Sequence, residues 1–460
     1  MKLIIFGTGK YYQEFKRYIN PEQVICFIDN DPSKQHSWLD GKEIKAVKDV
    51  DFLECDYVLV MVMRYQNIFE QLLRLGVPQE KIKLYFELGE MLHLHPSVNY
   101  GGRTISLKNW VQDDVHEHHV LLVAHELTRN GVAVVLMHTA EILIELGYSV
   151  IVTGLIGGAL EADLRDRNIG FITGMGAFYR GVEIKEYMHA VDFVISGSVG
   201  TADFVEYMSD TDIPIIWWMH ESNDQNFIDF NISQRRNIHY YAGGSRVVDM
   251  FKKYYPNRKI QKLLYFLPDK EKSQVRVKNK KLRVSVIGAV NYRKAQDIYV
   301  NAISLLPEES KISAEFDIVG SIVEPVIDVE GLSMRPEINY IGELSESSLE
   351  KYIDSVDILV SCSRDDPMPV VVSQAMQNEI LCIVSDQVGQ SEYIEDGKNG
   401  FIFHSENSQQ LSDILKFCID NPEIVERMGK ASYKIYESFF SEKEMKRNLK
   451  KIIMEITMGE

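Results

Sequence analysis

Ser361-Cys-Ser-Arg-Asp-Asp-Pro-Met-Pro-Val-Val-Val-Ser-Gln-Ala-Met376 is the stretch of sequence that decides the fold class. A short apolar run at residues 358–360 leads into it and predicts a strand, and its second half predicts a helix. Polar side chains, two carboxylates and two prolines lie between the two. Open α/β sheets bind ligands just beyond the carboxyl ends of their strands. The stretch therefore indicates an α/β fold with a ligand site in this loop.

Similar apolar runs recur along the chain and alternate with helical patterns. Runs that are apolar throughout are typical of strands covered on both faces, which means parallel sheets with crossover helices. The expected strands lie at residues 24–28, 57–63, 120–123, 150–153, 193–195, 213–218, 284–287, 316–319, 358–360 and 382–384.

Two polar breaks divide this pattern. Residues 95–119 contain glycines, histidines and acidic residues without periodicity, and residues 268–281 are highly charged. Both breaks are typical of connections between folded units. The expected units are three Rossmann-like units at 1–94, 118–267 and 282–436, followed by a helical segment at 437–460.

Composition excludes several classes of protein. A net charge of −17 over 460 residues argues against general nucleic-acid binding, which needs a basic surface. The five cysteines form no CxxC pair, so we expect buried, reduced thiols. The first apolar run is too short for a signal peptide, and no apolar stretch approaches the ~20 residues of a membrane span. We expect a cytoplasmic protein, either free or held peripherally at the inner face of the membrane.

The N-terminal unit begins with an apolar run and the glycine turn Gly7-Thr-Gly9. Helix amides after such a turn suit a phosphate, and Asp29 stands where an acid can bind a ribose. Tyr12 occupies the place of the third glycine of the dinucleotide motif and would crowd the helix against the strand. Two interpretations stay open: a nucleotide-binding module, or an assembly module whose loop is vestigial. Asp29-Asn-Asp31 also has the spacing of an acidic metal motif.

The middle unit opens with residues 119–133, which predict a strand, a polar loop and the start of a helix. The loop holds His125, Asn130 and Gly131, and a glycine lets the backbone approach a ligand closely. His125-Glu is not a zinc motif, because HExxH would need a histidine at position 129, where the chain has arginine. His125 is therefore either a cleft residue or a structural histidine.

A second polar pair follows the aromatic-rich run at 213–218, which predicts a buried strand with His220 and Glu221 at its carboxyl end. A lone histidine is more often a core residue, but the position of His220 after a strand favours a site. The histidines at 116, 118 and 119 could ligate a metal, but they lack matching cysteines or carboxylates, so we expect a connecting segment.

The C-terminal unit carries a basic pair. Arg293 and Lys294 follow the strand at 284–287 and a glycine turn, where two cations and helix amides can clamp a diphosphate. The alternative is a solvated basic pair. Later in this unit, the loop of Gly389, Gln390, Ser391 and Glu392 follows another strand and could donate amides to phosphates.

Taken in this order, the motifs resemble the glycogen-synthase-like group of retaining glycosyltransferases, glycosyltransferase family 4. The resemblance covers about residues 118–456 and rests on four separate motifs. It implies the GT-B fold, with two facing Rossmann-like domains, here preceded by the smaller module. It also implies that the helix at 437–460 returns to the acceptor-side domain.

The resemblance implies roles for single residues. The family has Glu, seven residues, then Glu-Ala-Met, and here Asp366 and Gln374 replace the two glutamates. Asp366 would orient the donor sugar, Gln374 would bond the ribose, and His220 would contact the sugar near the reacting carbon. Asp366 and His220 are thus the expected catalytic residues. Ala295 replaces the glycine of the family's Lys-Gly pair.

The remaining sites follow from the same resemblance. Residues 282–436 would bind the donor and residues 118–267 the acceptor, with His125, Asn130, Gly131 and Glu221 in the cleft. No metal and no cofactor is expected, because cationic side chains and amides would carry the charge of the leaving diphosphate.

The expected function is transfer of a sugar, of the hexosyl type, from a nucleoside diphosphate sugar to a glycan, glycolipid or polysaccharide precursor, with retention. The alternative is a catalytically impaired partner subunit that stabilises or presents acceptors to an active glycosyltransferase, which Gln374 and the extra module favour. A GT-B-shaped sugar-nucleotide epimerase is a third possibility, although the cleft lacks an acid/base carboxylate set. Expected partners are the nucleotide sugar, a glycan or lipid-linked acceptor, and a membrane surface or other glycosyltransferases.

Overall fold

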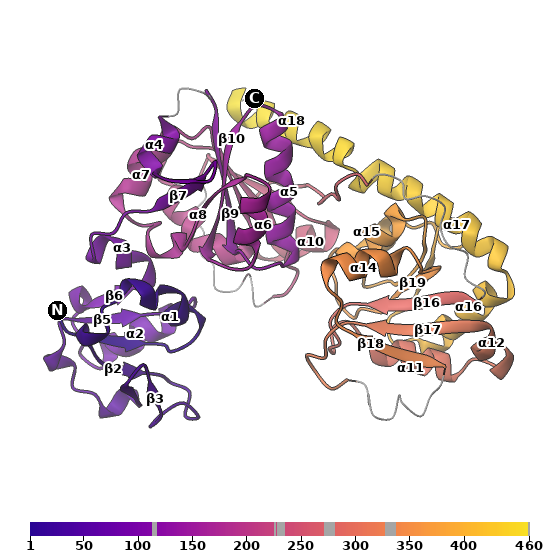
Figure 1. The fold of residues 1–460 in the computed structure, drawn as a ribbon, viewed down its shortest axis with the longest axis horizontal. Coiled ribbons are helices and arrows are strands. Elements are labelled where there is room, and N and C mark those ends of the chain that lie inside the picture. The colour runs from indigo at the N-terminus through magenta and orange to yellow at the C-terminus, as the bar shows by residue number, and fades with distance from the viewer. Residues whose placement is uncertain (113–116, 225–226, 228–234, 271–280, 327–336, 459–460) are drawn as a thin grey trace. The chain divides into compact units, whose positions relative to one another are not determined.

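The computed structural model describes residues 1–112, 117–224, 227, 235–270, 281–326 and 337–458 (Figure 1). The chain divides into two compact units. The first is Met1–Trp217 with Asn231–His239, and the second is Trp218–Phe230 with Tyr240–Glu460.

The first ninety residues build a six-stranded sheet in the order β3-β4-β2-β1-β5-β6. Its central strand β1 (Leu3–Phe6) is fully buried and pairs in parallel with β2 (Val24–Ile28) and β5 (Tyr57–Val60). The predicted strand at 24–28 is therefore confirmed, and the one predicted at 57–63 is present but ends at Val60. The other elements are β3 (Trp38–Leu39), β4 (Lys42–Lys45), β6 (Ile82–Leu84), α1 (Lys10–Phe15), α2 (Gln66–Arg74) and α3 (Leu88–Met91).

The second sheet has nine strands in the order β15-β14-β13-β12-β9-β10-β11-β7-β8. β9 (His119–Glu126) pairs in parallel with β10 (Ser149–Ile156) and β12 (Phe193–Gly197). Every residue of β10 is buried, as expected of a strand covered on both faces. The remaining strands are β7 (Ser97–Tyr100), β8 (Arg103–Ser106), β11 (Gly170–Ile172), β13 (Ile215–Met219), β14 (Ile238–Ala242) and β15 (Ile260–Lys262).

The helices that accompany these strands are α4 (Leu107–Val111), α5 (Gly131–Glu145), α6 (Leu160–Asp166), α7 (Val182–Met188), α8 (Ala202–Met208) and α10 (Ser245–Tyr254).

The polar break at residues 95–119 is not a free connection. β7 and β8 form an antiparallel hairpin, and β7 pairs with β11 at the edge of the nine-stranded sheet. Trp110 is completely buried, and its indole N–H donates a hydrogen bond of 2.9 Å to Ser149 Oγ. The polar composition misled because edge strands alternate between buried and exposed residues, so few apolar residues suffice.

Within the first unit, the N-terminal sheet shares a core with the loops that follow β10 and β11. A methyl group placed on Gly176 would lie 2.8 Å from the buried Phe15 ring, and one on Gly89 would lie 2.7 Å from the Phe178 ring. Such close approach is possible only for glycine. The N-terminal module is thus packed against its neighbour through aromatic side chains.

The C-terminal sheet contains six parallel strands in the order β18-β17-β16-β19-β20-β21. Figure 1 shows β16, β17 and β18 side by side. The strands are β16 (Leu282–Ile287), β17 (Ala314–Val319), β18 (Ile338–Gly342), β19 (Ile358–Ser361), β20 (Leu381–Ser385) and β21 (Phe401–Phe403). The helices are α11 (Gln296–Ser304), α12 (Glu308–Ser313), α14 (Glu346–Ile353), α15 (Val370–Gln377), α16 (Ser408–Asp420), α17 (Pro422–Ile435) and α18 (Glu442–Met458).

The last helix, α18, follows a π-helical turn at Tyr436–Phe440. Glu455 on α18 lies close to Tyr241 of β14, where its charge adds to the effect of burial and raises the pKa of Tyr241 to about 12. The predicted break at 268–281 lies mostly outside the described residues, since only 268–270 and 281 are placed.

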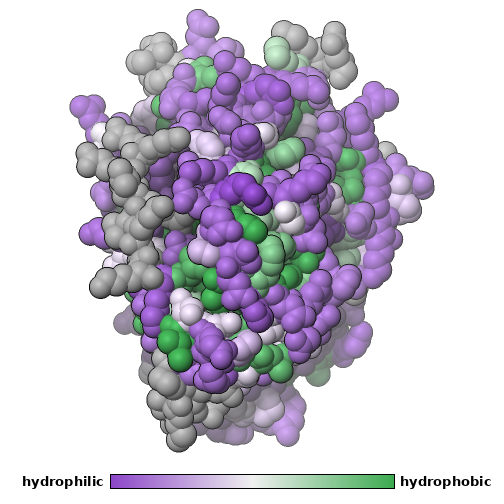
Figure 2. Space-filling view, turned by 90° about the vertical axis from the view of Figure 1, so that its right-hand side faces the viewer, coloured by the Kyte–Doolittle hydropathy of each residue, from purple (hydrophilic) through white to green (hydrophobic). Residues whose placement is uncertain are grey.

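The surface and the thiols agree with the composition. The face in Figure 2 is mostly hydrophilic, with hydrophobic residues in small groups between, which is ordinary for a protein surface. All five cysteines are buried free thiols, as predicted. Among the described residues, we find no helix with both the length and the apolar character needed to cross a membrane.

Candidate active site

The candidate site is built on the carboxyl ends of β16 and β19. Gly288 follows β16 with φ of +146°, and the chain then turns into α11 through Arg293 and Lys294. Asp366 follows β19 in the loop before α15 and is only 6% exposed. Because β16 and β19 are parallel neighbours, their ends meet at one edge of the sheet.

Asp366 and the basic pair meet at this edge. Lys294 Nζ donates to Asp366 Oδ2 at 2.5 Å, and Arg293 Nη1 lies 3.2 Å from the same oxygen. Arg293 also donates to the carbonyl of Asp365 at 3.0 Å. Lys294 is largely buried, with 18% of its side chain exposed, whereas half of the Arg293 side chain is exposed. The alternative that Arg293 and Lys294 are simply a solvated basic pair therefore does not hold for Lys294.

Arg364 holds the basic loop in place. Its backbone N–H donates to the Arg293 carbonyl at 2.8 Å, and its guanidinium donates to the Tyr292 carbonyl at 2.6 Å and to both oxygens of Asp297. The guanidinium also lies 4.2 Å from the centre of the Tyr292 ring. The hydrogen bonds that the Arg364 guanidinium donates to Asp297 raise the pKa of Arg364. The loop that carries Arg293 and Lys294 is therefore held in place by the contacts of Arg364 within the protein.

His220 lies just beyond β13, whose residues are all buried. Its ring contacts Trp218, with centroids 4.8 Å apart, and Gly243 leaves room for Nδ1, since a methyl group there would lie 2.8 Å away. Nε2 is buried and has no hydrogen-bond partner among the residues that the structure describes. Burial lowers the pKa of His220 to about 4, despite the opposing charge of Glu221. His220 is thus a neutral imidazole at neutral pH with one nitrogen unsatisfied, as at functional sites.

The loop after β20 differs from its prediction. Gly389 N–H donates to the Asp366 carbonyl at 2.9 Å, and Ser391 N–H donates to the Val388 carbonyl at 3.0 Å. Both amides are used within the protein, contrary to the expectation that they face a phosphate. The loop instead fixes the backbone of Asp366, and any methyl group on Gly389 would overlap the carbonyl of Pro367 at 1.6 Å.

Two side chains of this loop also point elsewhere. Gln390 is completely buried, and its Nε2 donates to Pro369 O at 2.8 Å and to Tyr265 OH at 3.1 Å. Glu392 accepts hydrogen bonds from Ser245 Oγ at 2.5 Å and from Lys262 Nζ at 3.4 Å. Gln390 is placed in the interior under α15 rather than on the expected donor surface.

Gln374 lies on α15 and is half-buried. Its side chain makes no hydrogen bond with any residue that the structure describes. An amide in this state can still bond a ligand hydroxyl, though more weakly than a carboxylate would.

The loop after β9 belongs to the first unit. Asn130 caps α5 by accepting from Ala133 N–H at 3.0 Å, and it donates to Thr128 Oγ1, so it has a structural role. Gly131 is the first residue of α5 and is exposed. His125 Nδ1 is buried and is bonded by none of the described residues, and Nε2 lies 3.8 Å from Glu126 Oε1. His125 therefore keeps one ring nitrogen available, and Gly131 is exposed.

Glu126 is bound by the N-terminal module, since Lys10 Nζ donates to Oε2. Burial opposes ionisation of Glu126, but the hydrogen bonds from Lys10 and from Thr128 outweigh it and lower its pKa. Glu221 accepts from the backbone N–H of His220 at 3.1 Å. Of the clustered histidines, His118 pairs with Asp192, His119 bonds the Trp110 carbonyl, and position 116 lies outside the described residues.

The N-terminal glycine turn is closed by side chains of the loop that follows β2. Asp29 accepts from Thr8 Oγ1 at 2.6 Å, from Thr8 N–H at 3.2 Å and from Lys34 Nζ at 3.2 Å. Burial pushes the pKa of Asp29 upward, but these bonds prevail and lower it. The acid that would bind a ribose is therefore already engaged.

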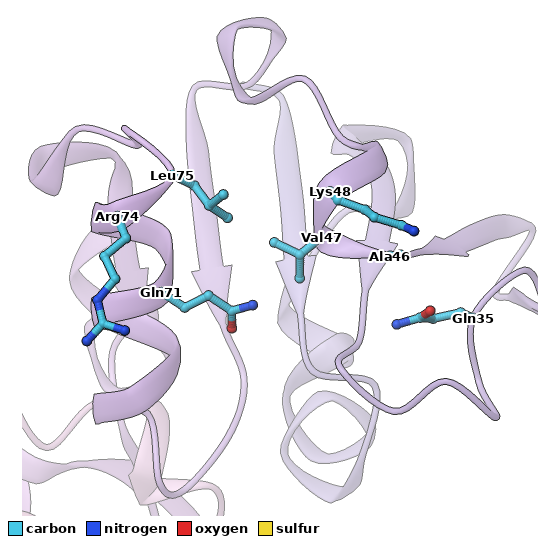
Figure 3. Close-up of a pocket in the computed structure, with 7 residues that line it drawn as sticks. All are labelled: Gln35, Ala46, Val47, Lys48, Gln71, Arg74 and Leu75. Atoms are coloured by element: carbon cyan, nitrogen blue, oxygen red, sulfur yellow. The ribbon is translucent and has the colours of Figure 1, made fainter.

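A pocket of about 400 Å³ in this module lies away from the turn (Figure 3). It is lined by Gln35, Ala46, Val47, Lys48, Gln71, Arg74 and Leu75. The Gln71 amide is paired with Asn30 in both directions, and Gln35 donates to the Asp29 carbonyl. No residue of the glycine turn contributes, so this pocket does not support a nucleotide site of the dinucleotide type.

Sequence reasoning missed Arg246, Ser222 and Asp365. Arg246 Nη2 donates to Asp365 Oδ1 at 3.0 Å, and Ser222 Oγ donates to the same carboxylate at 3.3 Å. Ser222 stands two residues after His220, and Asp365 directly precedes Asp366. The signal was the sequence Gly243-Gly-Ser-Arg246, where two glycines follow a strand and precede a cation.

Three family models match parts of the chain. "Glycosyl transferases group 1" matches residues 268–435, "Glycosyl-transferase family 4" matches residues 116–262, and "C2185-like, N-terminal" matches residues 1–83. Spore coat protein SA of Bacillus subtilis (strain 168) is 29% identical over 121 residues, which are 26% of this chain and 32% of that protein.

Alpha-D-kanosaminyltransferase of Streptomyces kanamyceticus is 24% identical over 151 residues, 32% of this chain and 38% of that protein. The matched part of this chain thus spans about a third of the length of these relatives.

Solved structures resemble a larger part of the chain. HepE (Alr3699) of Anabaena, in complex with UDP and glucose, has a TM-score of 0.62 at 13% identity, covering 73% of this chain and 99% of that one. A glycosyltransferase of Rickettsia africae has a TM-score of 0.62 at 16% identity, covering 75% and 100%. At such identities the likeness shows the fold alone, and the fold prediction is confirmed. This chain has the GT-B fold, and two separate parts of it match the family models for glycosyl transferases group 1 and glycosyl-transferase family 4.

Proposed function

We propose that the protein is a glycosyltransferase that moves a hexosyl group from a nucleoside diphosphate sugar to a glycan, glycolipid or polysaccharide-precursor acceptor. The observation that carries the proposal is the cluster of Lys294, Arg293 and Asp366 at the ends of β16 and β19. It joins two cations for a diphosphate to a carboxylate for sugar hydroxyls, at the edge where α/β sheets bind ligands. HepE, with the same fold, was solved with UDP and with UDP-glucose.

In the proposed reaction, the bond between the anomeric carbon and the diphosphate breaks, and a bond to an acceptor oxygen forms. The acceptor proton is released to a leaving phosphate oxygen. Lys294 and Arg293 stabilise the charge that develops on the diphosphate, so no metal is needed for that purpose. A donor that takes over these cations frees the carboxylate of Asp366 to accept from sugar hydroxyls.

In this proposal His220 contacts the donor sugar near the reacting anomeric carbon and not the diphosphate. As a neutral imidazole, it can donate or accept a hydrogen bond through Nε2, which no described residue bonds. It lies two residues before Ser222, whose hydroxyl donates a hydrogen bond to the Asp365 carboxylate. Retention of anomeric configuration follows from the family resemblance. We further propose that the protein acts in the cytoplasm, free or at the inner face of the membrane.

The test is a binding screen followed by a product assay. Nucleotide sugars are added to the purified protein, and binding is measured by thermal shift and calorimetry. Release of nucleoside diphosphate is then followed with and without EDTA, and the anomeric configuration of the product is read by NMR. Binding and EDTA-resistant turnover are expected. Turnover that EDTA abolishes would contradict the metal-free mechanism, and an inverted product would contradict retention.

The second candidate is an impaired partner subunit that stabilises or presents acceptors to an active glycosyltransferase. Gln374 favours it, because an amide replaces the family's charged acceptor and has no supporting bond from a described residue. Gln374→Glu distinguishes the two. If it converts a silent protein into an active one, the partner role is supported, whereas comparable turnover in both forms supports the enzyme.

A further inference from the structure

Three cations surround the dipeptide Asp365-Asp366, and one of them comes from outside the C-terminal sheet. Arg293 and Lys294 belong to the loop after β16, whereas Arg246 belongs to α10, next to β15 of the nine-stranded sheet. Arg246 forms two hydrogen bonds of 3.0 Å, from Nη2 to Asp365 Oδ1 and from Nη1 to Gln387 Oε1. It therefore joins the loop after β19 to the loop after β20.

The backbone around Arg246 is shaped for this contact. Gly243 and Gly244 precede α10, and a methyl group on Gly244 would lie 3.0 Å from Met368 Cε and 3.3 Å from the Pro367 carbonyl. A methyl group on Gly243 would meet His220 instead. The two glycines thus let the start of α10 lie between the candidate catalytic histidine and the loop that carries Asp366.

Gln387 extends the effect of Arg246 to the backbone of Asp366. The Asp366 N–H donates to the Gln387 carbonyl at 3.2 Å, and the Asp366 carbonyl accepts from Gly389. Arg246 thereby holds Asp365, the residue directly before Asp366. It also holds Gln387, whose carbonyl accepts from the Asp366 N–H. An isolated exposed ion pair contributes little, but a guanidinium with two directed bonds fixes geometry.

Resting on the proposed function, we infer that Arg246 is a positioning residue for the donor sugar. It acts through Asp365 and Gln387 to set the direction of the Asp366 carboxylate. It does not touch the diphosphate in this role. Loss of Arg246 should therefore weaken recognition of the sugar, while the clamp of Arg293 and Lys294 keeps its hold on the nucleotide.

The experiment compares UDP-glucose with UDP by calorimetry on the full chain. Arg246→Ala is expected to weaken UDP-glucose about tenfold, which corresponds to about 1.4 kcal/mol, and UDP by less than about twofold. Asp365→Ala should show the same pattern, and the double variant should be no weaker than the single ones, because the two residues act as one pair. Arg235→Ala is the matched control, since Arg235 pairs with Asp210 at 2.9 Å on an exposed surface.

Each outcome decides the inference. Selective, non-additive loss of UDP-glucose supports it. Equal loss of UDP-glucose and UDP overturns it in favour of direct contact with the diphosphate. Unchanged affinity for both, in variants that melt like the wild type, overturns it while leaving the proposed function intact. If the wild-type protein binds neither probe, the inference about UDP-glucose is overturned, whereas the proposed function is decided separately by the screen of other nucleotide sugars.

Discussion

Two glycine turns in this chain follow the first strand of a parallel sheet, and they differ in what they leave free. After β1, Thr8 of the turn donates to Asp29, which follows the neighbouring strand β2, and Lys34 of the same β2 loop pairs with that carboxylate, so it is engaged by nearby groups of its own module. After β16, Lys294 and Arg293 reach the carboxylate of Asp366 on a different strand. The first arrangement stabilises a loop, whereas the second sets exchangeable charges at a sheet edge.

The difference teaches that a glycine turn indicates a fold more firmly than it indicates a site. Both turns contain glycines with positive φ, Gly7 at +98° and Gly288 at +146°. Function depends on whether the neighbouring cations and carboxylates can be recruited by a ligand. Five predictions follow from this difference, beginning with the chemical step that neither turn supplies.

His220→Ala is expected to cause the largest effect, a loss of about 100-fold or more in kcat with little change in nucleotide affinity. His220 lies on neither turn, so chemistry and nucleotide binding should separate. Turnover and donor affinity are measured together with Tm, because Trp218 implies a packed neighbourhood. His118→Ala serves as a control for loss of an exposed imidazole. A stable variant with wild-type turnover would make His220 a core residue only.

Lys294→Ala should weaken binding of UDP by about 10- to 150-fold, since a hydrogen bond between charged groups contributes about 1.5–3 kcal/mol. The matched change beside the other turn, Lys34→Ala in the loop after β2, should leave UDP affinity unchanged. Calorimetry of both variants checks the comparison directly. Equal effects of the two substitutions would mean that the N-terminal turn also binds the nucleotide.

Arg293→Ala should weaken UDP binding in the same direction but less than Lys294→Ala. Its side chain is half-exposed, so water replaces its interactions at a lower cost. Its contribution should also decline at high salt. Titrations at two ionic strengths measure this. A larger loss for Arg293→Ala than for Lys294→Ala would reverse the assignment of the principal cation.

Asp29→Asn should lower the stability of the protein by about 1–3 kcal/mol at neutral pH without affecting UDP binding. The folded-state pKa of Asp29 is below its ordinary value, so its stabilisation is present at neutral pH and is lost as pH falls through the folded pKa. Urea unfolding between pH 3 and pH 7 tests this. The difference between variant and wild type should shrink towards acid, and a constant difference would contradict it.

The sheets could be predicted from the sequence because buried parallel strands are apolar throughout. The predicted segments that correspond to β2, β12 and β19 are examples. Sequence reasoning failed at 95–119, where the edge strands β7 and β8 need few apolar residues. It predicted a unit at residues 1–94 but not how that unit packs against the residues that follow. The packing of Phe15 against Gly176 depends on residues far apart in sequence, so no local pattern announces it.

In the candidate site, sequence reasoning identified residue types better than their directions. Lys294 and Asp366 could be identified because each is a charged residue that follows a predicted strand, where α/β sheets bind ligands. Gln390 could not be placed, because whether its amide faces outward or lies under α15 depends on Tyr265, more than a hundred residues away. Arg246 was missed for the same reason, since its partners belong to two distant loops.

Ala295→Gly should have the smallest effect, with Tm within a few degrees of the wild type. Ala295 adopts a left-handed φ of +57°, which costs a residue with a Cβ about 1–2 kcal/mol. Glycine relieves this strain, but it loses more chain entropy on folding, about 0.5–1 kcal/mol, and removes a buried methyl group of about 0.8 kcal/mol. These terms nearly cancel.

The reverse change in the other turn, Gly7→Ala, should be clearly destabilising, because its methyl group would lie 2.5 Å from Val62 Cγ1. Thermal unfolding of both variants compares the turns, and a large gain from Ala295→Gly would show that the loop that carries Arg293 and Lys294 is held under strain.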